Sequence, residues 1–265
     1  MEYILEYYFD IGLMRDQFEP VIKGFWETLK LSIIAGILSL AWGLVLAVLR
    51  QLPGKAFAPV RGLVIAYIDV FRGIPLLMVL LLVSGFLSSA ASPVGGELIP
   101  RSIGIPDWFG QPSPFWYGII ALTLTYGAYM AEVYRAGIEA VPSGQMEAAR
   151  SLGMSHGQGM RYIVVPQAIR RVIPPLLNDY IALMKDTSLV AFLGFTEVVQ
   201  AGFNFSSSNF NGSALMLGAL LFLMVTVPLA RIVDRLIARE QARTQRSGRS
   251  TEPDEPVMNT GLAGA

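Results

Sequence analysis

Three long stretches without a charged side chain constrain this sequence most. One runs from Leu31 to Leu49 and a second from Trp108 to Ala131. The third lies within 198–230, with its apolar core starting at about Ala214. A helix needs about 20 apolar residues to cross the hydrocarbon core of a membrane, which is about 30 Å thick. Each stretch therefore predicts a membrane-spanning helix.

The composition of the chain agrees with a membrane protein. Of its 265 residues, 53% are hydrophobic and only 15% are charged, against about a quarter charged in an ordinary soluble domain. The 20 basic and 20 acidic residues balance, so there is no basic surface for nucleic acid. Because the chain has no cysteine and a single histidine, His156, we expect no metal site.

Two further stretches, 60–87 and 168–195, are apolar except for a few ionisable side chains. We count them as spans and predict an all-α membrane protein with five transmembrane helices. The predicted helices lie at about 24–49, 58–87, 114–140, 167–189 and 212–238.

Lys and Arg collect in alternate connections of this topology. They are frequent in 50–61, in 135–171 and after 230, whereas 88–114 holds only Arg101 and 191–213 holds none. Basic residues stay on the cytoplasmic side of a membrane. We therefore predict the N-terminus outside and the C-terminus in the cytoplasm.

The two ends of the chain are expected to lie outside the bundle. The first ten residues hold three acidic and no basic side chains, unlike a signal peptide, so no cleavage is expected. Residues 1–20 are predicted to form an extracytoplasmic or interfacial segment. Residues 241–265 are rich in Ser, Gly, Pro and mixed charge, and we predict a disordered cytoplasmic tail.

Small residues recur along the first predicted span. Ser32, Gly36, Ser39 and Gly43 are spaced by four, three and four residues, which places them on one helical face. Such a face lets another helix approach closely, although glycine is also common in membrane helices without any such role.

The connection 141–166 looks unusually structured. Pro142 interrupts the preceding span, Ser143 is a candidate N-cap, and Gly153 stands where a left-handed C-terminal residue is wanted. A short soluble helix is therefore predicted between them.

A second short helix is predicted after it. Ser155 and Gln158 have the spacing of a capping box, and this helix should stop before Pro166. On the first helix, Ala148 and Ala149 leave one face nearly smooth. We favour a docking element for another protein over a helix lying on lipid, because the large apolar face needed for anchoring is missing.

This loop resembles the signature of inner-membrane permease subunits of ATP-binding cassette (ABC) importers. That signature is Glu-Ala-Ala, three residues, Gly, nine residues, then Ile-x-Leu-Pro. Here Val165 replaces the leucine and the spacing is otherwise the same. The resemblance assigns contact with the ATPase to Glu147, Ala148, Ala149, Gly153, Ile163 and Pro166.

Other segments resemble the polar amino acid branch of that family, which includes histidine, glutamine and glutamate permeases. They are 127–135, 71–77 and 185–189. The similarity spans about 21–240, which we expect to be one transmembrane permease domain in a bacterial inner membrane. The outer loop 88–114 and the tail lie outside it.

The resemblance implies a division of labour. Two permease subunits, identical or sister chains, form the pathway within the lipid, and an extracytoplasmic binding protein delivers the solute. Separate cytoplasmic ATPase subunits bind ATP and magnesium and grip the loop. The permease itself has no catalytic residue and binds no cofactor, and this sequence indeed holds no Gly-x4-Gly-Lys-Ser/Thr phosphate loop.

The same resemblance suggests how the loop transmits motion. We expect closure of the ATPase dimer to pull residues 147–153 as a rigid unit. Gly153 and Pro166 would then set the angle at which this motion enters the fourth span.

Ionisable residues inside the spans suggest where solute passes, because a charge in a membrane helix usually faces a partner or a wet cavity. Arg72 lies eleven residues beyond Arg61, or roughly 16 Å along a helix. Arg72, Lys185 and Asp186 are therefore candidates for the pathway. An ion pair between Arg72 and Asp69, and an outer gate shaped by Lys185 and Asp186, are the structural alternatives.

At the inner end of the third span, Glu132, Arg135 and Glu139 have the spacing of an ion-paired helix surface. Two functional alternatives also remain. One is the same importer architecture for an opine or a compatible solute, and the other is a stand-alone secondary transporter, which the missing second half disfavours.

Overall fold

A computed structural model describes residues 6–91, 110–111 and 113–249, and all regular elements among them are helices. This agrees with the predicted all-α class. In chain order they are α2 (Ile11–Asp16), α3 (Phe18–Arg50), η1 (Lys55–Phe57), α4 (Ala58–Gly73), α5 (Leu76–Ala91), α6 (Ser113–Glu139), α7 (Ser143–Ser151), α8 (His156–Gly159), η4 (Met160–Val164), α9 (Val165–Asp186), η5 (Thr187–Leu193), α10 (Val198–Asn209) and α11 (Ser213–Arg249).

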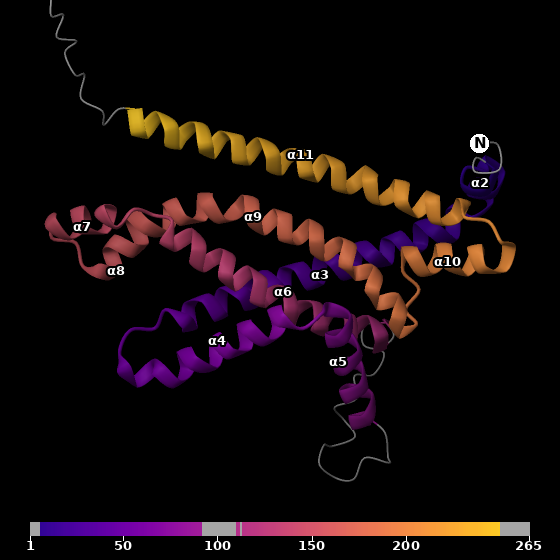
Figure 1. Cartoon of the computed structure of the whole chain (residues 1–265), viewed down its shortest axis with the longest axis horizontal. Coiled ribbons are helices and arrows are strands. Elements are labelled where there is room, and N and C mark those ends of the chain that lie inside the picture. Colours follow the sequence, from indigo (N-terminus) through magenta and orange to yellow (C-terminus); the bar gives the residue numbers. More distant parts are fainter. Residues whose placement is uncertain (1–5, 92–109, 112, 250–265) are drawn as a thin grey trace, which may run out of the picture.

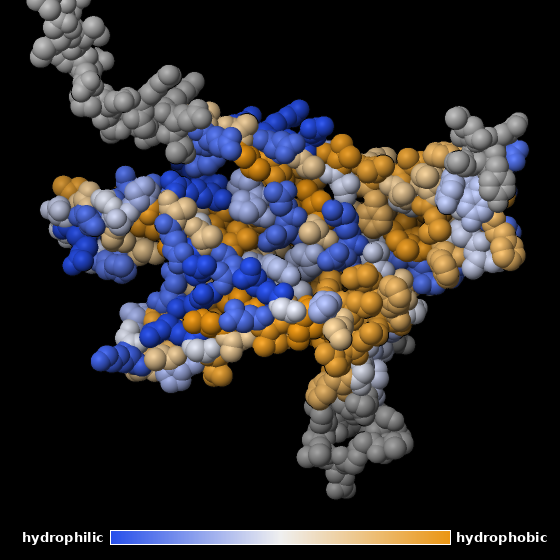
Figure 2. All heavy atoms as spheres, viewed as in Figure 1, coloured by the Kyte–Doolittle hydropathy of each residue, from blue (hydrophilic) through white to orange (hydrophobic). Residues whose placement is uncertain are grey.

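The long helices α3, α6, α9 and α11 follow the long axis of the molecule (Figure 1). One end carries α7, α8, the turn between α3 and α4, and the last turns of α11, whereas α2, α10 and the start of α11 lie at the other. Figure 2 shows hydrophilic side chains gathered over the end with α7, α8 and the start of α4. The three basic connections of the sequence thus share one end.

The helix α6 forms the centre of the bundle, where α3, α4, α5 and α9 pack against it. The predicted small-residue face of α3 is confirmed as a packing face, because Ser32, Gly36, Ser39 and Gly43 are all buried. A Cβ on Gly43 would lie 2.9 Å from the carbonyl oxygen of Gly127 on α6. Only glycine permits this approach of the two backbones.

Two helices of the described part, α3 and the 213–242 portion of α11, are long and apolar enough to cross a membrane. The number rises to four if each of two bent pairs, 55–73 with 76–88 and 156–193 with 198–209, is one span. The helix α6 has 27 residues and is surrounded by other helices. It therefore needs less apolar surface than a helix facing lipid.

The prediction of one continuous helix over 58–87 is wrong. The chain bends by 110° between α4 and α5, and Ile74 at the break is extended (φ −96°, ψ 132°). Pro75 is the cause, because proline disfavours helical backbone at the residue before it and lacks the N–H that would continue the ladder. Both halves are apolar, so hydropathy alone hides the break.

Other helix ends also differ from prediction. The helix α3 begins at Phe18 rather than near residue 24, and α11 continues to Arg249, so residues 241–249 of the predicted disordered tail are helical. The rest of that tail, 250–265, lies outside the described residues, as do 1–5 and most of the outer loop. The helix α10 was not predicted.

The helix α10 is fastened to α3 by a buried carboxylate. Glu197 precedes α10 and is fully buried; its Oε1 accepts from the Gln200 N–H at 2.8 Å and caps the helix. The Thr28 hydroxyl of α3 lies 3.4 Å from Glu197 Oε2, and it accepts from the N–H of Val198 at 3.3 Å.

Replacing Glu197 with alanine should therefore destabilise the protein. The loss should be about 1–3 kcal/mol, the cost of leaving buried donors unpaired. Glu197→Gln keeps an acceptor oxygen and should lose less. Thermal unfolding in detergent micelles measures this, with Glu19→Ala, at an exposed position, as the control. An unfolding midpoint of Glu197→Ala equal to wild type would contradict the capping role.

Candidate functional site

The loop 141–166 folds as two short helices, α7 and α8, joined by a glycine bend. Gly153 has φ +82°, which confirms the predicted left-handed residue. The capping box is also confirmed, since Ser155 Oγ accepts from the Gln158 N–H at 3.3 Å and Gln158 Oε1 accepts from the Ser155 N–H at 2.8 Å. The expected N-cap is wrong by one residue: Pro142 holds that position and no side chain caps α7.

The second short helix was predicted to stop before Pro166, and this prediction is wrong. The chain continues from α8 through one wider, π-helical turn, η4, directly into α9, with Pro166 in the first turn of α9. A proline is tolerated there because the N–H groups of the first turn have no partner within the helix, so the N–H that proline lacks is not missed. The loop and α9 thus form a continuous helical path.

The base of the loop is packed against both neighbouring spans. Val141, Val164 and Ala168 form a buried cluster with partly buried side chains of α6, α7 and η4 around it. The Arg171 guanidinium of α9 donates to the carbonyl oxygen of Ala140. These contacts fix the loop to α6 on one side and α9 on the other.

Fewer residues of α7 are exposed than the sequence suggests. Glu147 and Ala148 are exposed, but Ala149 is only 3% exposed. It faces α8, where a Cβ on Gly159 would lie 3.6 Å from the Ala149 Cβ. The prediction that both alanines face a partner is therefore wrong for Ala149, because successive helical residues point about 100° apart. Leu152, 84% exposed at the tip, was missed.

The remaining predicted loop residues are placed around this surface. Gly153 and Pro166 are exposed, and Ile163 is half-buried. The exposed Glu147, Ala148, Leu152 and Gly153 form what we call the loop face.

A cavity of about 470 Å³ lies where α4 breaks into α5. It brings together two of the three predicted pathway residues, Arg72 and Asp186. Lys185 is exposed and is not among the lining residues. The lining consists of Arg72, Gly73, Ile74, Pro75, Leu76, Thr125, Tyr126, Tyr129, Asp179, Ala182 and Asp186.

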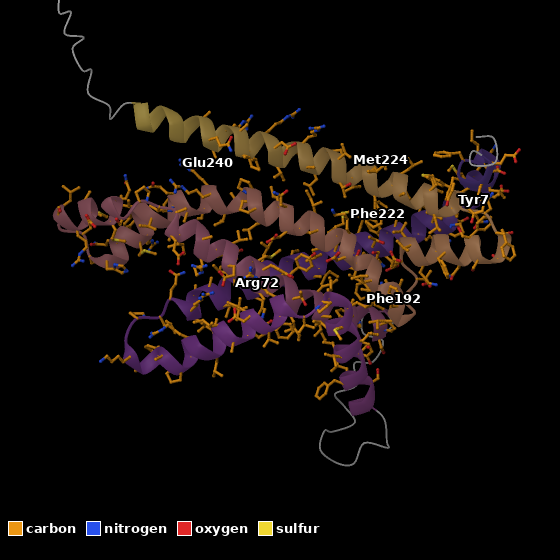
Figure 3. All side chains as sticks on the ribbon, in the orientation of Figure 1. Tyr7, Arg72, Phe192, Phe222, Met224 and Glu240 are labelled. Carbon is orange, nitrogen blue, oxygen red and sulfur yellow. The ribbon has the colours of Figure 1, made fainter. Side chains whose placement is uncertain are left out.

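Arg72 points from α4 toward the centre of the bundle (Figure 3). Its guanidinium carbon lies 5.7 Å from the ring centroid of Tyr129 on α6, a cation–π distance. It also interacts electrostatically with Asp179 on α9. The alternative pairing with Asp69 is not formed in the described part of the chain, where no ion pair within 4 Å joins them.

The two carboxylates of the cavity differ in their partners. The Tyr126 hydroxyl donates to Asp186 Oδ2 at 2.7 Å. Asp179 Oδ2 and Thr125 Oγ1 are buried without a hydrogen-bond partner among the described residues. Buried polar atoms normally have partners, so these two unpartnered oxygen atoms set the walls of this cavity apart from an ordinary helix contact.

Sequence reasoning missed four polar lining residues: Thr125, Tyr126, Tyr129 and Asp179. The first three lie in an apolar run and carry no charge. Asp179 is a charged residue within a span, and the rule that such residues face cavities is the signal that selects it.

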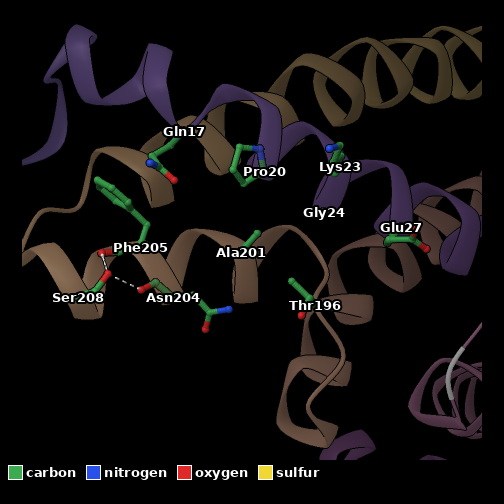
Figure 4. Close-up of a pocket in the computed structure, with 10 residues that line it drawn as sticks. All are labelled: Gln17, Pro20, Lys23, Gly24, Glu27, Thr196, Ala201, Asn204, Phe205 and Ser208. Atoms are coloured by element: carbon green, nitrogen blue, oxygen red, sulfur yellow. Dashed lines mark hydrogen bonds between the residues drawn. The ribbon is translucent and has the colours of Figure 1, made fainter.

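A second cavity, of about 610 Å³, lies between the start of α3 and α10. Figure 4 shows its lining residues from α3, from α10 and from the turn before α10. Two of its charged residues are already ion-paired within α3, Lys23 with Glu19 and Glu27 with Lys30, both at 2.6 Å. The cavity at the α4–α5 break is therefore the better candidate site.

Charged residues also join α3 and α6 near the loop. Arg135 pairs with Glu132 at 2.7 Å and with Glu139 at 2.6 Å, as the spacing predicted. Arg50 at the end of α3 adds a further ion pair to Glu132.

Comparisons with known proteins agree on one family. Residues 39–242 match the model of the family described as binding-protein-dependent transport system inner membrane component. A probable glutamine ABC transporter permease, GlnM of Bacillus subtilis, is 34% identical over 231 residues, covering 87% of this chain and 97% of GlnM. The glutamate/aspartate import permease GltK of Escherichia coli O157:H7 is 36% identical over 195 residues, 72% of this chain and 80% of GltK.

Two solved structures of ABC transporters have a similar fold. A crystal structure of an amino acid ABC transporter with histidines has a TM-score of 0.73 and 31% identity, covering 87% of this chain and 98% of the other. The methionine ABC transporter MetNI in an inward-facing form has a TM-score of 0.65 at 21% identity, over 83% and 95% of the two chains. The latter likeness shows the fold alone.

Proposed function

The chain belongs to the family of binding-protein-dependent transport system inner membrane components, and from this membership we propose that it forms the translocation pathway of an importer for a polar amino acid. It is a permease subunit of the amino acid ABC importer type. The family match over 39–242, which contains the whole loop, carries this conclusion.

The topology that we propose has five spans, with the N-terminus outside and the loop and C-terminus in the cytoplasm of a bacterial cell. The spans are α3, the α4–α5 pair, α6, the α9–η5 helix and α11. Support comes from the three basic connections, which lie at one end of the molecule (Figure 1). Because cytoplasmic loops carry an excess of Lys and Arg, we assign this end to the cytoplasmic side.

We further propose that the loop face docks onto a separate ATPase subunit, which binds ATP and magnesium. The exposed carboxylate of Glu147 and the small Ala148 supply the contact, and the exposed Leu152 supplies an apolar anchor. A second permease subunit and an extracytoplasmic binding protein complete the importer. The permease contributes no catalysis of its own.

The cavity at the α4–α5 break is our proposal for a solute site on the pathway. Broken membrane helices in transporters place polar backbone and helix ends at solute, and here Arg72 and Asp186 face the same space. A zwitterion needs a cation for its carboxylate and an acceptor for its ammonium group, and the cavity provides both.

The function is tested in vesicles reconstituted with the permease, its ATPase and its binding protein. We expect ATP hydrolysis and uptake to rise when the binding protein carries one of the polar amino acids, and to stay basal with empty binding protein. Stimulation by an opine or a compatible solute and by no amino acid would overturn the substrate assignment.

A further inference from the structure

The last helix, α11, lies at the edge of the bundle, where it packs against α9, α10 and α3 (Figure 1). Only 22% of its apolar span window is buried, against 44% for α3. Large apolar side chains are therefore exposed along it, among them Leu220, Met224 and Val227. Contiguous apolar surface of this kind marks contact with a membrane or another protein.

This exposed face continues into arginines. Arg231 follows the exposed Met224 by seven residues, or about two helical turns. Arg235 and Arg239 follow at spacings of four residues, and all three arginines are exposed. Val233 points the other way and is buried. We call Arg231, Arg235 and Arg239 the arginine row, which lies on the same side of α11 as its exposed apolar side chains.

The arginine row begins at the depth of the lipid headgroups. Arg231 lies eighteen residues after Ser213, or roughly 27 Å along the helix, and the hydrocarbon core is about 30 Å thick with about 5–7 Å of headgroups on each side. Arg235 and Arg239 lie roughly 6 and 12 Å beyond Arg231. Both are therefore within the headgroup layer or within a Debye length of it, which is about 8 Å in physiological salt.

Little acidic charge offsets the row. Asp234 pairs with Arg231 at 3.5 Å, but both side chains are largely exposed, and such surface pairs are weak. Neither Arg235 nor Arg239 has an ion pair within 4 Å among the residues whose side chains the structure describes. The row thus presents positive charge beside an apolar face.

A lipid fits this combination better than a protein does. Two copies of the chain meeting symmetrically through this face would set the same arginines against each other, which is unfavourable. The loop face proposed for the ATPase lies on α7, a separate element. An anionic phospholipid matches both parts, because its acyl chains cover the apolar side chains while its phosphate meets guanidinium groups.

We propose that the arginine row is a binding site for anionic phospholipids at the inner end of α11. Their headgroups contact Arg231, Arg235 and Arg239, and their acyl chains lie along the exposed apolar face. This inference goes beyond the proposed function and is independent of the solute that the importer carries.

The test measures which lipid lies beside the row. The chain has no cysteine, so Val227→Cys, at an exposed position four residues before Arg231, takes a single bimane label. The full chain is reconstituted in vesicles of equal parts phosphatidylglycerol and phosphatidylcholine, with bromine on the acyl chains of one lipid or the other. Bromine quenches the label on contact, and both kinds of vesicle carry the same surface charge. We expect quenching to favour phosphatidylglycerol by at least about fivefold, the factor for one arginine near an anionic surface.

Charge variants then assign this preference to the row. Glutamine at all three positions should remove the preference, whereas lysine at the same positions keeps the charge and should keep most of it. Asp234→Asn removes the acidic partner of Arg231 and should increase the preference. Lys55→Gln, which removes an exposed charge from the turn between α3 and α4, is the control and should change nothing. Salt at about 1 M shortens the Debye length to about 3 Å and should weaken the wild-type preference.

Several outcomes contradict the proposal. Equal quenching by the two lipids in wild type, or an unchanged preference in the glutamine variant, would show that the row does not select anionic lipid. Quenching by neither lipid would mean that a second protein chain covers this face. Loss of the ATPase from the purified glutamine variant, with its lipid preference unchanged, would assign the row to the ATPase instead. No transport is measured, so a failure of the proposed function is seen separately, in vesicles with all subunits.

Discussion

Replacing Gly153 with aspartate should uncouple uptake from ATP hydrolysis without unfolding the permease. Gly153 ends α7 at φ +82°, a conformation that costs an ordinary L-residue about 1–2 kcal/mol. A side chain there either strains the bend or changes the angle between α7 and α8. Because the loop runs through η4 directly into α9, that change displaces the loop face relative to the spans. Uptake in reconstituted vesicles should fall by about fivefold to thirtyfold, the factor to which a strain of about 1–2 kcal/mol corresponds.

A graded series separates backbone strain from collision with the ATPase. No atom of the described residues lies within 4 Å of a Cβ at Gly153, so an internal effect among them arises from the backbone. Asparagine and aspartate adopt left-handed backbone more readily than β-branched residues, so Gly153→Asn should keep more uptake than Gly153→Val. Gly157→Asp is the control, since Gly157 is exposed in the same loop and helical. Wild-type uptake and stimulated ATP hydrolysis in Gly153→Asp would disprove the coupling model.

The loop could be predicted closely because its signals are local. Gly153 and the Ser155 capping box depend on residues three or four apart, and the structure has both. The direction of Ala149 was not predictable in the same way. Its burial depends on Gly159 of α8, and where two helices meet is decided by tertiary packing.

The spans were predicted from hydropathy, which reports length and apolar content but not direction. It therefore located the stretch 58–87 and missed the 110° bend within it. The residues Gly73-Ile74-Pro75 were a usable signal, since the residue before a proline disfavours helix. The helix α10 was missed for the opposite reason: its run of serines and asparagines reads as loop, and the cap from Glu197 becomes convincing only once Thr28 is beside it.

Two of the three residues that the sequence predicts for the pathway line the candidate site. Arg72 and Asp186 stood out because charges within spans are rare, and both line the cavity. Lys185 is also a charged residue within a span, but it does not line the cavity. Whether a charged residue faces the cavity depends on the rotation of its helix, which here is set by the packing of α9 on α6 and is not visible in a one-dimensional pattern.

The packing of α6 on α9 is itself testable at Gly137, just before the loop. A Cβ on Gly137 would lie 2.0 Å from Cγ1 of Val172 and 3.5 Å from the carbonyl oxygen of Ala168. Val172 is buried and has little rotational freedom within a helix, so it cannot turn away cheaply. Gly137→Ala should therefore lower the stability of the protein by about 1–3 kcal/mol, the usual cost of overpacking, measured as thermal unfolding in detergent micelles.

The same contact provides its own rescue. Val172→Ala removes the colliding methyl group, and Gly137→Ala combined with Val172→Ala should be more stable than the sum of the two single losses allows. Residues in direct contact show such coupling at about 0.5–3 kcal/mol. Gly62→Ala is the control, because Gly62 is helical in α4 and no described residue comes within 4 Å of a Cβ placed there. Additive losses would mean that α6 and α9 do not touch here, and the loop would then lack the rigid base through which the ATPase is proposed to move α9.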